Sequence, residues 1–138
     1  MYALSELMAV DPAANARKYA WCTDLFGSSG GDMCLSDGVN WKPVRPAFVQ
    51  TVANGNQNMS FTCMAQAPTQ VIQGTLTSVR SVTLLTTYAY RGARFRVKRE
   101  AGGLFSLLTN GVGIALNSWA DFEFDGSAWV QTASGGLL

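Results

Sequence analysis

The sequence predicts an all-β protein: an antiparallel sandwich, a jelly-roll-like fold or a small barrel, preceded by a short N-terminal arm. Three observations predict this class. Short runs of β-forming residues recur between turn residues along most of the chain. Charged and apolar side chains alternate strictly in residues 93–99 and 119–125, as in strands with one buried face. Asp-Gly pairs at residues 37–38 and 125–126 favour hairpin turns.

Composition excludes several other classes. The 138 residues suit a single domain. Hydrophobic residues make up 48% of the chain and charged residues 14%, so the chain is too apolar to remain disordered. No apolar run reaches the roughly 18–20 residues of a membrane-spanning helix. The formal net charge of +1 gives no general attraction to nucleic acid or to an anionic membrane, and we expect neither as a partner.

Residues 1–16 are predicted to form an N-terminal docking arm, and residues 17–138 the β domain. Four large apolar side chains in the arm have loose helical spacing: Tyr2, Leu4, Leu7 and Met8. The Asp-Pro pair at residues 11–12 ends this pattern, because the residue before a proline is disfavoured in a helix. A helix this short is marginal by itself. It therefore docks either on a capsid or neighbouring subunit, or as an ordinary turn on its own domain.

The β domain is expected to contain short strands at residues 18–25, 33–35, 39–44, 61–64, 69–75, 78–86, 93–99, 104–108, 112–116, 119–124 and 128–132. Many short strands at this spacing are typical of sandwiches, jelly rolls and small barrels. The turn residues between them argue against a parallel α/β plan.

Two hairpins share the pattern Asp-Gly-x-x-Trp, which ends in Trp41 and in Trp129. A two-residue turn would pair Ser36 with Val39 and Cys34 with Trp41, and likewise Phe124 with Ser127 and Phe122 with Trp129. In this register each tryptophan packs beside an apolar cross-strand neighbour. We therefore expect both to be buried structural anchors of their hairpins. The alternative is a pair of exposed tryptophans that stack on sugars.

Two charge ladders follow from the strict alternation. The basic ladder is Arg94, Arg96 and Lys98, and the acidic ladder is Asp121, Glu123 and Asp125. Each occupies one face of its strand, with apolar side chains on the other face. Facing strands with opposite ladders would fix each other's register, within one chain or between subunits. A nucleic-acid site is the weaker alternative, because no aromatic side chains share the basic face.

The residues needed for most enzyme chemistry are missing. Histidine is absent, which removes the commonest general base and metal ligand. A carboxylate pair for glycoside hydrolysis is conceivable, with Glu123 beside Asp121 or Asp125. The three cysteines are odd in number and have no CxxC spacing, so they predict buried thiols rather than a metal site or disulfide framework. We expect no enzyme activity, cofactor or metal.

Residues 33–44, which include Ser-Asp-Gly-Val-Asn-Trp, resemble a hairpin of tailed-bacteriophage virion proteins. Residues 92–130, which end in Trp-Ala-Asp-Phe-Glu-Phe-Asp-Gly-Ser-Ala-Trp-Val, are similar to the C-terminal β domain of many such proteins. The resemblance covers roughly residues 17–138. It implies an extracellular, usually trimeric β structure on a virion, and it carries no catalytic residues.

The chain lacks the heptads, collagen-like repeats and long shaft of a fibre. We therefore expect a capsid decoration (cement or head-fibre) protein, with a tail fibre tip or tail knob protein that binds a host receptor as the alternative. The implied partners are other copies in a homotrimer, and the major capsid protein or another virion protein. A host glycan or receptor is a partner only under the alternative. The expected location is the virion, after synthesis in the host cytoplasm.

Overall fold

The computed structural model describes residues 1–27, 30–45 and 50–137. The N-terminal unit, residues 1–45, comprises α1 (Leu4–Met8), β1 (Tyr19–Cys22), the 3-10 turn η1 (Leu25–Gly27), β2 (Asp32–Ser36) and β3 (Trp41–Pro43). The sandwich that follows comprises β4 (Gln50–Asn54), β5 (Met59–Thr62), β6 (Thr69–Gln73), β7 (Arg80–Leu85), β8 (Arg94–Arg99), β9 (Leu107–Thr109), β10 (Val112–Ile114), β11 (Ser118–Phe124) and β12 (Trp129–Gly136). No helix in the described ranges is long and apolar enough to cross a membrane.

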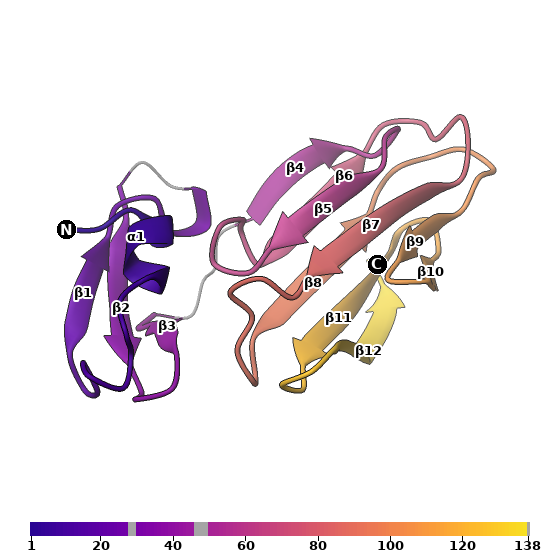
Figure 1. Cartoon of the computed structure of the whole chain (residues 1–138). Helices are drawn as coiled ribbons and strands as arrows, with labels where there is room; N and C mark the ends of the chain where they lie inside the picture. The colour runs from indigo at the N-terminus through magenta and orange to yellow at the C-terminus, as the bar shows by residue number, and fades with distance from the viewer. Residues whose placement is uncertain (28–29, 46–49, 138) are drawn as a thin grey trace.

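The sandwich consists of a five-stranded sheet in the order β12-β11-β8-β6-β4 and a four-stranded sheet in the order β10-β9-β7-β5 (Figure 1). The predicted all-β sandwich is confirmed, and the described strands do not close into a barrel. The strands within the two sheets are not antiparallel throughout. Four pairings are parallel: β4–β6, β5–β7, β6–β8 and β7–β9.

The parallel pairings have a simple topological cause. From β4 to β9 the chain alternates between the two sheets, so neighbours within one sheet are two strands apart in sequence. Consecutive strands reverse direction across the sandwich, and every second strand therefore runs the same way. The sequence-based prediction also missed β4, whose residues Gln50–Asn54 are mostly polar and lack a clear alternation.

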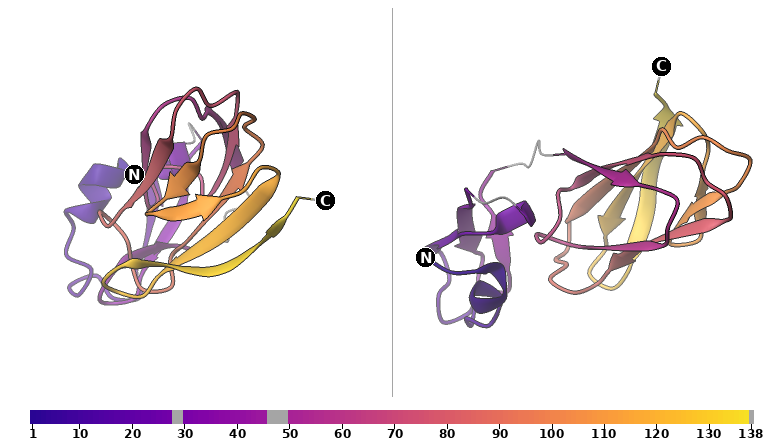
Figure 2. Two further views of the ribbon diagram at one scale, coloured as in Figure 1. Left: turned by 90° about the vertical axis from the view of Figure 1, so that its right-hand side faces the viewer. Right: turned by 90° about the horizontal axis from the view of Figure 1, so that it is seen from above.

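The predicted docking arm packs against the rest of the N-terminal unit of its own chain. Helix α1 packs on one face of the antiparallel β1-β2-β3 sheet, and both Leu4 and Leu7 are buried there (Figures 1 and 2). The Ala3 N–H donates to the Glu6 carboxylate at 2.8 Å, and the Leu4 N–H donates to Asp24 Oδ1 at 2.6 Å. Of the two interpretations left open, the structure supports the turn packed on its own domain. In the structure residues 1–16 and the β1-β2-β3 sheet lie together in the N-terminal unit.

The other two arm residues are also tied to this unit. Tyr2 exchanges backbone hydrogen bonds with β1, because its N–H donates to Trp21 O at 2.9 Å and its carbonyl accepts from Thr23 N–H at 2.8 Å. Met8 is half-buried against the hydrophobic core. In this conformation Leu4, Leu7 and Met8 are therefore not available to bind another protein, whereas the Tyr2 side chain is 39% exposed.

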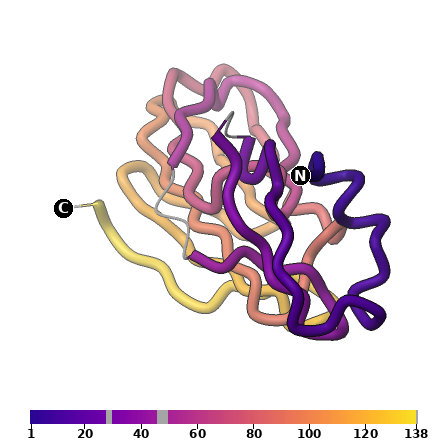
Figure 3. Tube along the Cα trace, turned by 90° about the vertical axis from the view of Figure 1, so that its left-hand side faces the viewer, coloured from indigo at the N-terminus to yellow at the C-terminus, as the bar shows by residue number. Residues whose placement is uncertain are grey.

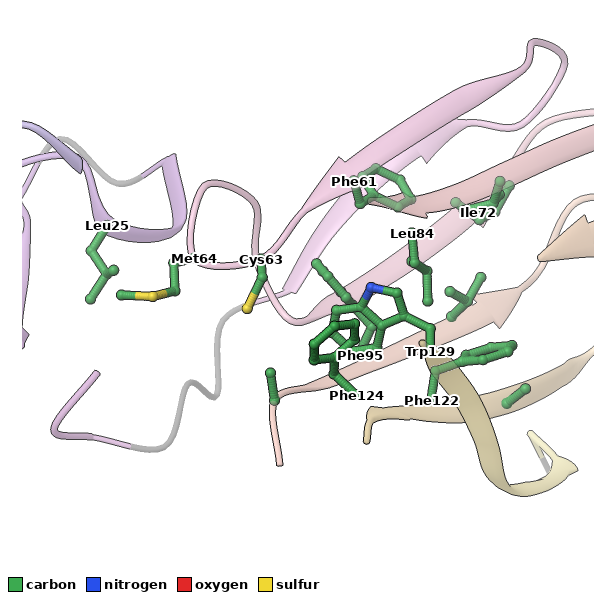
Figure 4. Packing of buried hydrophobic residues seen from close by; sticks show 14 of the residues in the cluster. Leu25, Phe61, Cys63, Met64, Ile72, Leu84, Phe95, Phe122, Phe124 and Trp129 are labelled. Carbon is green, nitrogen blue, oxygen red and sulfur yellow. The ribbon is translucent and has the colours of Figure 1, made fainter. Parts of the chain in front are cut away.

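Aromatic side chains from both sheets fill the core of the sandwich. Phe95 lies 6.3 Å from Phe61 and 5.2 Å from Trp129 between ring centroids, and Phe124 lies 5.4 Å from Trp129 (Figure 4). A smaller contact joins the N-terminal unit to the sandwich, where the Phe26 N–H donates to Met64 O at 2.6 Å. The tube view in Figure 3 shows the N-terminal unit in front of the sandwich, at the end where this contact lies.

Candidate functional site

The two charge ladders meet within one chain. Strands β8 and β11 are antiparallel neighbours, and their register places Arg94 opposite Glu123 and Arg96 opposite Asp121. The Arg94 Nη2 lies 3.1 Å from Glu123 Oε2. Arg96 donates from Nε and Nη2 to the two oxygens of Asp121 at 2.6 and 2.7 Å. These two pairs therefore form within one chain.

Arg96 forms the better defined of the two pairs. Its guanidinium lies 4.2 Å from the centroid of the Trp119 ring, so it bonds Asp121 in its plane and stacks on the indole with its face. Hydrogen bonding to Asp121 raises the pKa of Arg96. The carboxylates that a glycosidase would need are occupied by arginines, and the arginines that a nucleic-acid site would need are neutralised. The pairing therefore favours a structural role for the ladder.

The outer members of the ladders do not pair as predicted. Lys98 lies opposite Trp119 rather than opposite an acid. Asp125 lies in the turn after β11, where its Oδ1 accepts from the N–H groups of Ala128 and Ser127, each at 2.8 Å. These bonds lower the pKa of Asp125, with Ala128 the larger cause. Asp125 is therefore a turn residue, because the strand ends at Phe124.

Both Asp-Gly hairpins have four-residue loops, and the predicted registers are corrected. Ser36 pairs with Trp41 and Phe124 pairs with Trp129. In the first loop Asp37 Oδ1 accepts from Val39 N–H at 2.9 Å and Asn40 N–H at 2.7 Å, as Asp125 does in the second. The aspartate side chain thus stabilises a wider turn than the two-residue turn assumed from the sequence.

Trp41 and Trp129 are both buried, with exposed fractions of 5% and 8%. Their indole N–H groups donate to backbone carbonyls, Trp41 to Val10 O at 3.0 Å and Trp129 to Leu85 O at 2.9 Å. Buried indoles hydrogen-bonded in this way are not available for stacking on a sugar. The burial agrees with the expectation of hairpin anchors, although Trp41 has Ser36 rather than an apolar side chain opposite it.

The cysteines and carboxylates offer no reactive centre in the described part of the chain. Cys22, Cys34 and Cys63 are free and buried. Burial raises the pKa of Cys34 and of Cys63 to about 12, so these thiols stay protonated at neutral pH. No group of three potential metal ligands is found among the described residues.

The N-terminal unit has an exposed apolar surface that was not predicted from the sequence. We call it the outer face. It consists of Tyr19, Trp21 and Met33 on β1 and β2, with Trp21 directly opposite Met33. Tyr19 is 62% exposed, and Trp21 and Met33 are each 38% exposed. Helix α1 covers the opposite face of the same sheet. In β1 the large side chains Tyr19 and Trp21 share the exposed face, whereas the opposite face carries only small side chains such as Cys22. This arrangement was the signal in the sequence for a second contact surface.

Arg99 is a second structural residue whose role was not predicted from the sequence. Its guanidinium is buried and donates to three backbone carbonyls, those of Ala101, Ile114 and Phe105, at 3.1, 2.9 and 2.8 Å. These bonds hold the connection between β8 and β9, in which Leu104 is fully exposed. The alternation in β8 places Arg99 on the same buried face as Phe95 and Val97.

A cavity of about 410 Å³ lies where the N-terminal unit meets the sandwich. Its lining includes Phe26, Met64 and Tyr90, with Arg45 and Arg94 also part of the wall. Both arginines have partners, Asp32 for Arg45 and Glu123 for Arg94. Cys63 also lines the cavity, and burial raises the pKa of both Cys63 and Tyr90, so neither group is ionised at neutral pH. The arrangement is a joint between two packed units.

Comparison with known proteins gives this chain no relative. No protein-family model, no curated protein and no solved structure matches it significantly.

Proposed function

We propose that the chain is a structural protein of a bacteriophage virion, most specifically a capsid decoration protein. The proposal begins from the resemblance of residues 33–44 and 92–130 to phage virion proteins. It is supported by the fold, because the polar clusters described above hold strands in register and stabilise the packing. On this proposal the protein acts by binding to a surface and needs no cofactor.

The observation that carries the proposal is the outer face. Three large side chains, Tyr19, Trp21 and Met33, are exposed together on a small unit at one end of an elongated molecule (Figure 1). Exposed apolar clusters on soluble proteins commonly mark contact surfaces, and aromatic and Met side chains are enriched in such contacts. We propose that the outer face binds the capsid while the sandwich projects from it.

A reattachment assay tests this proposal. Particles of the phage that encodes the chain are stripped of it, mixed with purified protein and sedimented. The Tyr19→Ser/Trp21→Ser double variant should lose co-sedimentation, because it removes most of the exposed apolar area of the outer face. A matched control is Leu104→Ser, which removes an exposed apolar side chain at the far end of the sandwich and should still co-sediment. Equal binding of both variants would reject the outer face as the attachment surface.

A tail fibre tip or tail knob protein that binds a host receptor is the second candidate. The observation that favours it is the β8–β9 connection, where Leu104 is fully exposed and Phe105 is 44% exposed. Arg99 holds this loop at the end of the sandwich away from the N-terminal unit. An apolar loop presented at the tip of a projecting domain is suited to contact a receptor.

The copy number of the chain in mature particles separates the two candidates. Quantitative mass spectrometry of purified virions should find hundreds of copies for a decoration protein and only a few for a tail protein. Absence of the chain from purified virions would reject both candidates.

A further inference from the structure

Among the described residues, the two edge strands of the five-stranded sheet, β12 and β4, pair with no strand on their outer side. Proteins commonly protect edge strands with charged side chains, with proline or by making them short. Strand β12 has eight residues and β4 has five, and neither contains a charged residue or a proline. The charges of this sheet lie on the inner strands β8 and β11. The other sheet ends in strands of four and three residues, β5 and β10.

The backbone of β12 is directed toward open solvent at alternate residues. Phe124 uses its backbone toward β8, since its N–H donates to Ala93 O and its carbonyl accepts from Gly92 N–H, both at 2.9 Å. Its partner Trp129 therefore points its own N–H and carbonyl away from β11, and so does Gln131 two residues later. Beyond the bulge, the Leu137 N–H donates to Asn117 O, so Ser134 points outward.

The backbone of β4 has the same property on the opposite edge. The Gly55 N–H donates to Gln73 O at 2.8 Å, which fixes the alternation along β4. Residues 51 and 53 then face β6, while Gln50, Val52 and Asn54 direct their backbone groups outward. Each edge thus presents a row of donors and acceptors to a further strand.

The side chains of both edges are exposed as well. Residues 130–134 of β12 are all exposed, so side chains on both faces of the strand reach solvent. Figures 2 and 3 show the C-terminal part of β12 bending away from the rest of the sandwich. In β4 only Ala53 is half-buried, and Val52 is 61% exposed. Strands exposed on both faces have room for a neighbour.

We propose that β12 of one copy pairs with β4 of the next copy, so that the five-stranded sheet continues from subunit to subunit. A two-fold pairing of β12 with another β12 would leave β4 open, whereas head-to-tail pairing uses both edges. Repetition of such a contact gives a closed ring if the rotation closes. The ring size expected here, three subunits, rests on the proposed function; the edge pairing does not.

Two matched proline variants test the pairing in purified full-length protein. Gln131→Pro and Val52→Pro each remove one outward N–H, on β12 and on β4 respectively, that the monomer does not need. By light scattering, the unchanged protein should have three times the 14.8 kDa mass of one chain. Each variant should close no ring and have the mass of a monomer.

The decisive measurement is an equimolar mixture of the two variants. Gln131→Pro keeps an intact β4 and Val52→Pro keeps an intact β12, so the mixture should form a heterodimer of twice the mass of one chain. A dimer that only Gln131→Pro disrupts would indicate two-fold pairing of β12, and a mixture that stays monomeric would also overturn the proposal. A monomeric unchanged protein at tens of micromolar would overturn it outright.

A second pair of variants guards against unfolding by proline. Thr132→Lys and Val52→Lys place a charge on each edge and should also give monomers, with circular dichroism unchanged. Leu104→Lys adds the same charge in an exposed loop and should leave the assembly intact. Loss of assembly in Leu104→Lys would show that net charge, and not edge pairing, controls it. These measurements need no particles, so their failure is distinguishable from failure of the proposed function.

Discussion

Among single residues, Trp129 contacts both sheets of the sandwich, which its position in a hairpin pattern does not indicate. Its ring packs against Phe95 and Phe124, and its indole N–H donates to Leu85 O on β7 of the other sheet. We expect Trp129→Ala to lower the free energy of unfolding by about 3–5 kcal/mol, measured by urea denaturation. The matched control is Trp119→Ala, whose half-exposed ring stacks on Arg96 and should cost only about 1 kcal/mol. Equal losses in the two variants would contradict the assignment of Trp129 to the core.

Asp37 makes the first hairpin sensitive to acid. Lys42 and the N–H groups of Asn40 and Val39 bond this carboxylate and lower its pKa to about 2. A carboxyl group with a lowered pKa in the folded state stabilises it above the unfolded value of about 3.9, and this stabilisation is lost as the pH falls through the folded value. Thermal melts between pH 4 and pH 2 should therefore show a falling melting temperature, and Asp37→Asn should flatten that fall.

Lys42→Met is the companion variant for this pH dependence. It removes the largest cause of the lowered pKa of Asp37 but keeps the two backbone N–H donors. We expect an intermediate slope of melting temperature against pH. An unchanged slope in both variants would show that another carboxyl group controls the acid sensitivity.

Between elements, the pairing of β8 with β11 depends on two ion pairs of different quality. The Arg96 side chain is 41% exposed, bonds both oxygens of Asp121 and stacks on Trp119, whereas Arg94 is 77% exposed. A double-mutant cycle should give a larger coupling energy for Arg96–Asp121 than for Arg94–Glu123, both within the roughly 0.2–1 kcal/mol of exposed pairs. As the salt concentration rises toward 1 M, the coupling energy of Arg94–Glu123 should fall to zero before that of Arg96–Asp121. The reverse order would contradict the assignment of Arg96–Asp121 as the stronger pair.

The sequence was sufficient for those elements whose pattern is local. The alternation in residues 93–99 and 119–125 located β8 and β11 and indicated two opposite charge ladders, because both strands have one buried face and long runs. It left open whether the ladders pair within one chain or between subunits. It was insufficient for β4, where mostly polar residues form an edge strand through backbone pairing with β6 alone. The parallel pairings were equally hidden, since no local pattern states that consecutive strands belong to different sheets.

Two features could not be settled from the sequence, for physical reasons that a sequence pattern does not reveal. The hairpin registers were wrong because Asp37 and Asp125 bond backbone N–H groups two and three residues ahead, which widens the turn. The docking partner of residues 1–16 was left open because Leu4 and Leu7 are buried against strands that come later in the chain. In both cases the deciding contact is with an atom whose position depends on the fold.

For the molecule as a whole, the N-terminal helix determines whether the outer face exists. Deleting residues 1–12 removes Leu4 and Leu7 from the interior and the carbonyls of Val10 and Pro12, which accept from Trp41 Nε1 and Ser36 Oγ. We expect the amides of β1, β2 and β3 to lose protection in hydrogen-exchange mass spectrometry, while β6, β8 and β11 keep theirs.

This deletion distinguishes two possible roles of the helix: support for the β1-β2-β3 sheet and direct contact with the capsid. The truncated chain should fail to bind particles because the sheet that carries Tyr19 and Trp21 no longer holds its shape. Leu7→Ala in the full chain should destabilise the same unit by about 2–5 kcal/mol and weaken binding in proportion to its unfolding. The Tyr19→Ser/Trp21→Ser variant should instead fail to bind with its amide protection intact. If the deletion abolished binding but left β1–β3 protected, residues 1–12 would themselves contact the capsid, and the docking-arm interpretation would stand.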